Sequence, residues 1–114
     1  MALQWLQVVD SGNYKHAARM MSEQVRGQQN WVNYLNAQRT PLRGVSKRQV
    51  GDIRHTSTIP GLPGVRSYVV IEFKTSFERR TVATEEVVMA KMGCCWEVSG
   101  YSIATLTNKQ VNIR

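Results

Sequence analysis

A chain of 114 residues, 42% apolar and 20% charged, can form one domain with a single core and needs neither a metal nor a disulfide to fold. No apolar run approaches the roughly 20 residues that a membrane-spanning helix requires, so the composition excludes such a span. The formal net charge of +7 permits an anionic partner without requiring one, because a basic surface also serves solubility.

The first 40 residues predict three helices. Ala2, Trp5, Leu6 and Val9 recur at helical spacing and form the stripe of the first. A second helix is predicted from an N-cap at Asn13 to about residue 25, and a third from about residue 28 to 39. The third should end at Thr40, because Pro41 disfavours helical geometry at the residue before it.

The second half predicts four antiparallel strands. The first covers residues 45–58 with a bulge near Gly51, and a loop follows at 59–64. Three consecutive strands then lie within residues 65–103, where β-branched and aromatic residues alternate with polar ones. In the last of these, Trp96 and Val98 are predicted on one face and Tyr101 on the other. Residues 104–114 are predicted to be a partly disordered tail, which leaves one domain at 1–103.

These elements predict an α+β fold in which N-terminal helices cover one face of a curved four-stranded antiparallel sheet. On the second strand, the alternation places Val69, Ile71 and Phe73 toward the helices. Tyr68 and Val70 then lie on the opposite face, together with Val88 of the next strand. If exposed, these three residues would form an apolar patch for association.

No motif for chemistry occurs in the sequence. The two histidines, His16 and His55, are far apart, and no CxxC or HxxxH spacing is present. We therefore predict no metal site, no cofactor and no catalytic residue. Cys94 and Cys95 are adjacent on a strand and point to opposite faces, so we expect two free thiols.

An acid–base enzyme is the main catalytic alternative, of the isomerase or dehydratase type. It needs a carboxylate that points into a cavity between helices and sheet. The candidates are Asp10, Asp52, Glu85 and Glu86, all expected to be solvated, although Glu85 shares strand parity with the apolar Val87. The expected lining of such a cavity is Trp5, Tyr14, Trp31, Tyr34, Phe73 and Met89.

Basic residues cluster between residues 39 and 54. This candidate patch consists of Arg39, Arg43, Lys47, Arg48 and Arg54. Such a segment can bind a polyanion, but it has no Phe, Tyr or Trp for base stacking. Nucleic acid is therefore a disfavoured partner, and a solvated face is the preferred interpretation.

Four segments resemble a known bacterial family. They read ALQWLQVVDSGNY, NWVNYLNAQRTPLRGVSKR, SYVVIEFKTSF and WEVSGYSI, and together they resemble domain of unknown function 4019. The resemblance implies a cystatin-like or nuclear-transport-factor-two-like cone. It also implies export to the periplasm or the medium, with a leader removed before the first helix. The family carries no established activity, so the resemblance implies no mechanism.

The sequence thus favours a non-enzymatic exported domain that binds a ligand or another protein. Folds of this kind commonly pair through their sheets, so we expect a homodimer formed by the sheet. The enzyme and the polyanion-binding module remain as alternatives.

Overall fold

The computed structural model describes residues 2–42, 44–57, 67–78, 81–92 and 95–105. Its helices are α1 (Ala2–Asp10), α2 (Tyr14–Met20), α3 (Glu23–Arg26) and α4 (Trp31–Arg39), followed by the 3-10 turn η1 (Thr40–Leu42). Its strands are β1 (Val45–Thr56), β2 (Tyr68–Phe77), β3 (Val82–Met92) and β4 (Cys95–Thr105). The α+β class is confirmed, and β4 extends two residues past the predicted domain end. The predicted loop at 59–64 and the tail from residue 106 lie outside the described residues.

The four strands form one antiparallel sheet, as predicted, and their order in it is β1-β2-β3-β4. The register of β1 on β2 shifts between Val50 and Ile53, which confirms the bulge near Gly51. Val50 pairs with Phe73, and Ile53 pairs with Ile71. Paired residues share a face, so the helix-bearing face continues from β2 onto β1.

The predicted second helix is interrupted. Met21 leaves helical geometry with a ψ of 158° and forms a parallel bridge to Val98 of β4. Ser22 then donates its backbone N–H to the Val98 carbonyl, at 2.8 Å. The apolar spacing of Met21 and Val25 was compatible with one helix, but this pairing with the edge of the sheet divides it into α2 and α3.

The third helix begins later than predicted. Asn30 caps it by accepting the N–H of Asn33 at 3.1 Å, and α4 ends at Arg39 as expected. Thr40 nevertheless keeps helical dihedrals, because the chain continues into the 3-10 turn instead of turning extended before Pro41.

A bulge in β4 corrects the predicted face of Tyr101. The pairing of β3 with β4 shifts between Val88 and Met89, so that Val88 faces Gly100 and Met89 faces Val98. The extra residue, Ser99, is buried, and its hydroxyl lies 2.9 Å from that of Ser22. Beyond the bulge Tyr101 shares the face of Val98, where its ring packs on Trp5 with centroids 5.3 Å apart.

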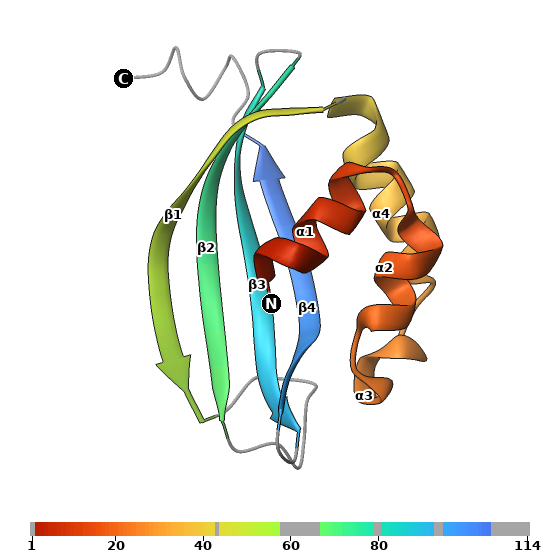
Figure 1. Ribbon diagram of the computed structural model, residues 1–114, viewed down its shortest axis with the longest axis vertical. Helices are drawn as coiled ribbons and strands as arrows, with labels where there is room; N and C mark the ends of the chain where they lie inside the picture. Colours follow the sequence, from red (N-terminus) through yellow and green to blue (C-terminus); the bar gives the residue numbers. More distant parts are fainter. Residues whose placement is uncertain (1, 43, 58–66, 79–80, 93–94, 106–114) are drawn as a thin grey trace.

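The core lies between the helices and the β3–β4 side of the sheet. Trp5, Leu6 and Leu35 have no exposed surface, and Val87 meets them from β3. Figure 1 shows α1 lying across β3 and β4, with α2, α3 and α4 beside it. No described helix lies over β1 in this view. The helical cover is therefore partial, and part of the helix-bearing face is left open.

Two smaller observations complete the fold. Cys95 is disulfide-bonded, so the expectation of two free thiols is wrong; Cys94 lies outside the described residues. Within the described ranges, no helix has the length and apolar character needed to cross a bilayer.

Candidate functional site

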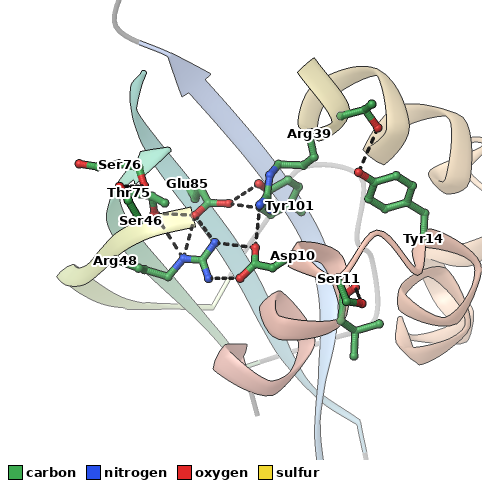
Figure 2. Close-up of polar contacts among 12 residues, drawn as sticks. Asp10, Ser11, Tyr14, Arg39, Ser46, Arg48, Thr75, Ser76, Glu85 and Tyr101 are labelled. Carbon is green, nitrogen blue, oxygen red and sulfur yellow. Dashed lines mark hydrogen bonds and ion pairs between the residues drawn. The ribbon is translucent and has the colours of Figure 1, made fainter. Parts of the chain in front are cut away.

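Four charged side chains from four different elements meet at one end of the core. Asp10 ends α1, Arg39 ends α4, Arg48 lies on β1 and Glu85 lies on β3. We call these four residues the charge network. Figure 2 shows both arginines reaching between the two carboxylates.

Each arginine of the network forms an ion pair with both carboxylates. Arg39 Nη2 lies 2.6 Å from Asp10 Oδ1, and Arg39 Nη1 lies 3.4 Å from Glu85 Oε2. Arg48 Nη1 lies 2.7 Å from Asp10 Oδ2, and Arg48 Nη2 lies 2.9 Å from Glu85 Oε1. Two positive and two negative groups therefore cancel within a small volume.

Two hydroxyl groups complete the surroundings of Glu85 (Figure 2). Thr75 on β2 donates to Glu85 Oε1 at 2.6 Å, and Tyr101 on β4 donates to Oε2 in a short hydrogen bond. Glu85 has no exposed surface. Its expected solvated position is therefore wrong, and the alignment of Glu85 with Val87 was the correct signal.

Electrostatics hold Asp10 in its charged form. Burial raises the pKa of this carboxyl, but hydrogen bonds from Arg48 and Arg39 outweigh burial and leave the pKa lowered from its usual 3.8. For Tyr101, burial and the negative charge of Glu85 raise the pKa of the phenol. Asp10 thus carries a stable charge, and Tyr101 keeps the proton that it donates to Glu85.

The network is poorly arranged for proton transfer. A general base needs an accessible lone pair and a pKa near the working pH. Both oxygens of Glu85 accept donors from the protein, and the pKa of Asp10 is shifted away from neutrality. The described contacts give these carboxylates a structural role: they neutralise two arginines at the junction of α1, α4 and the sheet.

Arg39 supports the same interpretation. It is buried, its Nε has no hydrogen-bond partner among the described residues, and its guanidinium carbon lies 4.9 Å from the ring centre of Phe77. The aromatic face offers partial compensation by a cation–π contact. A cleft of about 460 Å³ adjoins the network at Arg39 and Asp10, but that Nε is not exposed to it.

The predicted cavity lining is not gathered around one cavity. Trp5, Trp31, Phe73 and Met89 are buried in the core, and Tyr14 and Tyr34 pack against it. Tyr14, Trp31, Phe73 and Met89 each border a different surface cleft. Side chains therefore fill the space between the helices and the β3–β4 side of the sheet.

The predicted basic patch is divided in the structure. Arg39 and Arg48 turn inward to the charge network, whereas Lys47 and Arg54 are exposed; Arg43 lies outside the described residues. Arg54 lies 3.4 Å from Glu86 and 3.9 Å from Asp52. The preferred interpretation of this segment as a solvated face is therefore wrong for Arg39 and Arg48, which point inward.

The predicted association face is also not an exposed patch. Tyr68 and Val70 are buried, and Val88 is half-buried. The strand register does place these residues on the face opposite to Phe73. Association through this face would need exposed side chains, and Tyr68 and Val70 are not exposed.

Exposed apolar surface lies instead on the helix-bearing face. Leu3, Val50 and Ile53 are 51%, 52% and 53% exposed. Two neighbouring clefts, of about 210 and 270 Å³, lie on this surface, and Ala2 and Ile71 line both of them. We call this surface the apolar trough; its lining residues are Ala2, Leu3, Val50, Ile53, Val69, Ile71, Phe73, Met89 and Trp96.

The trough follows from the fold. Val50 and Ile53 have the parity that faces the helices. However, α1 lies over β3 and β4 (Figure 1) and meets β1 through the Asp10–Arg48 ion pair, which leaves Val50 and Ile53 exposed. Gly51 and Asp52 interrupt the alternation in β1. The sequence pattern therefore did not show that Val50 and Ile53 share a face.

Comparison with known proteins gives one match, which covers most of the chain. A family model described as "Protein of unknown function (DUF4019)" matches residues 1–101. No curated protein matches the chain, and no solved structure matches it.

Proposed function

The chain belongs to the DUF4019 family, and we propose that it is a non-enzymatic binding domain whose binding surface is the apolar trough. One observation carries the proposal: three exposed apolar residues, Leu3, Val50 and Ile53, border the same hollow on the helix-bearing face. Grouped apolar side chains at a surface typically mark a site for a ligand or a partner, since scattered ones need no such explanation.

The charge network argues against the enzymatic alternative. An isomerase or dehydratase of this architecture needs a carboxylate that is free to accept a proton. Arg39 and Arg48 neutralise both inward carboxylates, and the core side chains fill the space that a substrate would occupy. The trough, in contrast, is open, and none of the described residues that line it is acidic.

An uncharged hydrophobic dye tests the proposal without assuming a natural ligand. Nile red should bind the folded protein, and Ile53→Asp should weaken that binding by about tenfold or more, because the trough loses apolar contact and gains a charge. Val82→Asp is the matched control, since Val82 is also an exposed apolar residue but pairs with Ser76 at the opposite end of β2.

Fluorescence titration gives both affinities, and circular dichroism shows whether each variant is folded. Equal Nile red binding by wild type, Ile53→Asp and Val82→Asp would overturn the trough as the binding surface.

Self-association through the sheet is a second candidate. The strand β1 is an edge of the described sheet, and it carries the exposed Val50 and Ile53. Such an edge is a template for pairing. Light scattering at tens of micromolar should then show a dimer that Ile53→Asp dissociates; a wild-type monomer at that concentration removes this candidate.

The cone fold and export are parts of the proposal that rest on the family resemblance alone. Detection of the native protein in the periplasmic or extracellular fraction tests export, and its confinement to the cytoplasmic fraction would contradict it.

A further inference from the structure

The apolar trough continues into a cleft of different character. This neighbouring cleft has a volume of about 410 Å³ and shares Trp96 with the trough. Its lining includes the cationic Lys91 and the imidazole of His55. We call His55, Lys91 and Trp96 the basic end of the trough.

Strand register places the basic end on the same face as the trough. His55 pairs with Val69, which lines the trough, and Lys91 pairs with Trp96. Lys91 also shares the parity of Met89, two residues earlier on β3. One continuous surface therefore changes from apolar around Ile53 to basic at Lys91.

The charges of this surface all have one sign. His55 and Lys91 are exposed, and neither forms an ion pair within the part of the chain that the structure describes. None of the described residues lining the trough or the basic end is Asp or Glu, so the formal charge of this lining comes from Lys91. The chain as a whole carries a formal charge of +7, so the surrounding field also favours an anion.

We infer that the trough binds a single-chain fatty acid, with the hydrocarbon chain along the apolar lining and the carboxylate at the basic end. This inference rests on the proposed function, because it names the ligand class of the same surface. An aliphatic chain suits a lining of Ile, Val, Leu and Met, and a carboxylate suits Lys91 and His55.

The charge pattern favours this occupant over a second copy of the chain. Two copies would bring like net charges together, which opposes association. A neutral hydrophobic ligand would use the trough but would leave the basic end without a counterion. The fatty acid is the occupant that matches both halves of the surface.

Calorimetry with dodecanoate and dodecyltrimethylammonium tests the inference, since these amphiphiles share a chain and differ in the sign of the head group. Dodecanoate should bind at least about threefold more tightly than the cation, and added salt should reduce the difference. Decanoate should bind up to about 16-fold more weakly than dodecanoate, because it lacks two methylenes and each buried methylene strengthens binding about fourfold.

Lys91→Gln should weaken dodecanoate binding about threefold and leave Nile red binding unchanged. Lys74→Gln is the matched control: Lys74 is an exposed lysine whose register partner is Thr84, on the opposite face of the sheet. It should change neither affinity.

The outcomes separate the inference from the proposed function. If Nile red binds in the Ile53-dependent way but dodecanoate does not bind, or binds no better than the cation, the fatty acid inference is wrong and the binding surface stands. If dodecanoate binding is insensitive to Lys91→Gln, the placement of the carboxylate is wrong. If neither probe depends on Ile53, both proposals fail together.

Discussion

Glu85 occupies the centre of the charge network with no exposed surface, in contact with Arg39 and Arg48. Removing one charge from a buried group of ion pairs leaves its partners uncompensated in a poorly solvated place. We expect Glu85→Gln to lower the free energy of unfolding by about 3–5 kcal/mol, measured by urea denaturation.

Glu86→Gln is the matched control for that change. Glu86 is 37% exposed and forms an ion pair with Arg54 at 3.4 Å, so its loss should cost no more than about 1 kcal/mol. Equal losses in the two variants would show that the network contributes nothing beyond an ordinary surface pair.

Asp10 gives the stability a predictable dependence on pH. Its pKa in the folded protein is lowered from 3.8, so the unfolded chain takes up the proton first as the pH falls. The contribution is complete above the unfolded value and is lost as the pH falls through the lower folded value. Asp10→Asn should therefore be less stable than wild type by about 2 kcal/mol at neutral pH, with a gap that closes below about pH 4.

Chemical denaturation of both proteins between pH 7 and pH 2.5 measures this gap. A difference between wild type and Asp10→Asn that stays constant over the range would mean that the Asp10 carboxylate is not stabilised by its arginines.

Two members of the network, Glu85 and Arg39, carry a signal of burial in the sequence, but the group as a whole does not. Glu85 shared its parity with Val87, and Arg39 follows Trp31 and Leu35 at helical spacing, which places it on the buried stripe of α4. Because Arg39 and Arg48 lie close together in a basic segment of the sequence, they instead suggested a surface patch. What joins them to Asp10 is a set of contacts between elements, which local periodicity does not contain.

At the scale of elements, Gly100 fixes the close approach of β4 to β3 beside the bulge. A β-carbon at this position would lie 3.2 Å from both Cβ and Cγ2 of Val88, and the Cβ atom cannot move without the backbone of β3. Gly100→Ala should therefore destabilise the protein by about 1 kcal/mol, despite the usual gain from replacing glycine.

The double variant Gly100→Ala/Val88→Ala tests the cause. Removing the Val88 methyl groups opens the space, so the cost of Gly100→Ala should vanish or reverse in that background, measured as a coupling free energy by urea unfolding. Independent, additive losses would indicate that the contact with Val88 is not what selects glycine.

The elements themselves were largely predictable, because apolar spacing and turn residues identify helices and strands locally. The antiparallel sheet, the bulge near Gly51 and the end of α4 followed from the sequence. The division of α2 from α3 did not, since it depends on the bridge between Met21 and Val98. The face of Tyr101 was wrong for the same kind of reason: the inserted residue at Ser99 is set by pairing with β3.

At the scale of the whole molecule, the helices cover less of the sheet than the sequence suggested. Three amphipathic segments predicted a helical cover on one sheet face, but α1 lies across β3 and β4, and no described helix lies over β1 in Figure 1. The exposed apolar surface consequently lies at Leu3, Val50 and Ile53, and not at the predicted Tyr68, Val70 and Val88. Which part of a sheet face stays uncovered depends on helix placement, which no pattern in one strand specifies.

The measurement that tests the central claim most directly is methyl NMR of the protein during titration with Nile red. If the trough is the binding surface, the methyl signals of Leu3, Val50, Ile53 and Ile71 should shift together and saturably, while those of Val82 and Val70 stay in place. Shifts confined to other methyl groups, or shifts at Val82 equal to those at Ile53, would contradict the account.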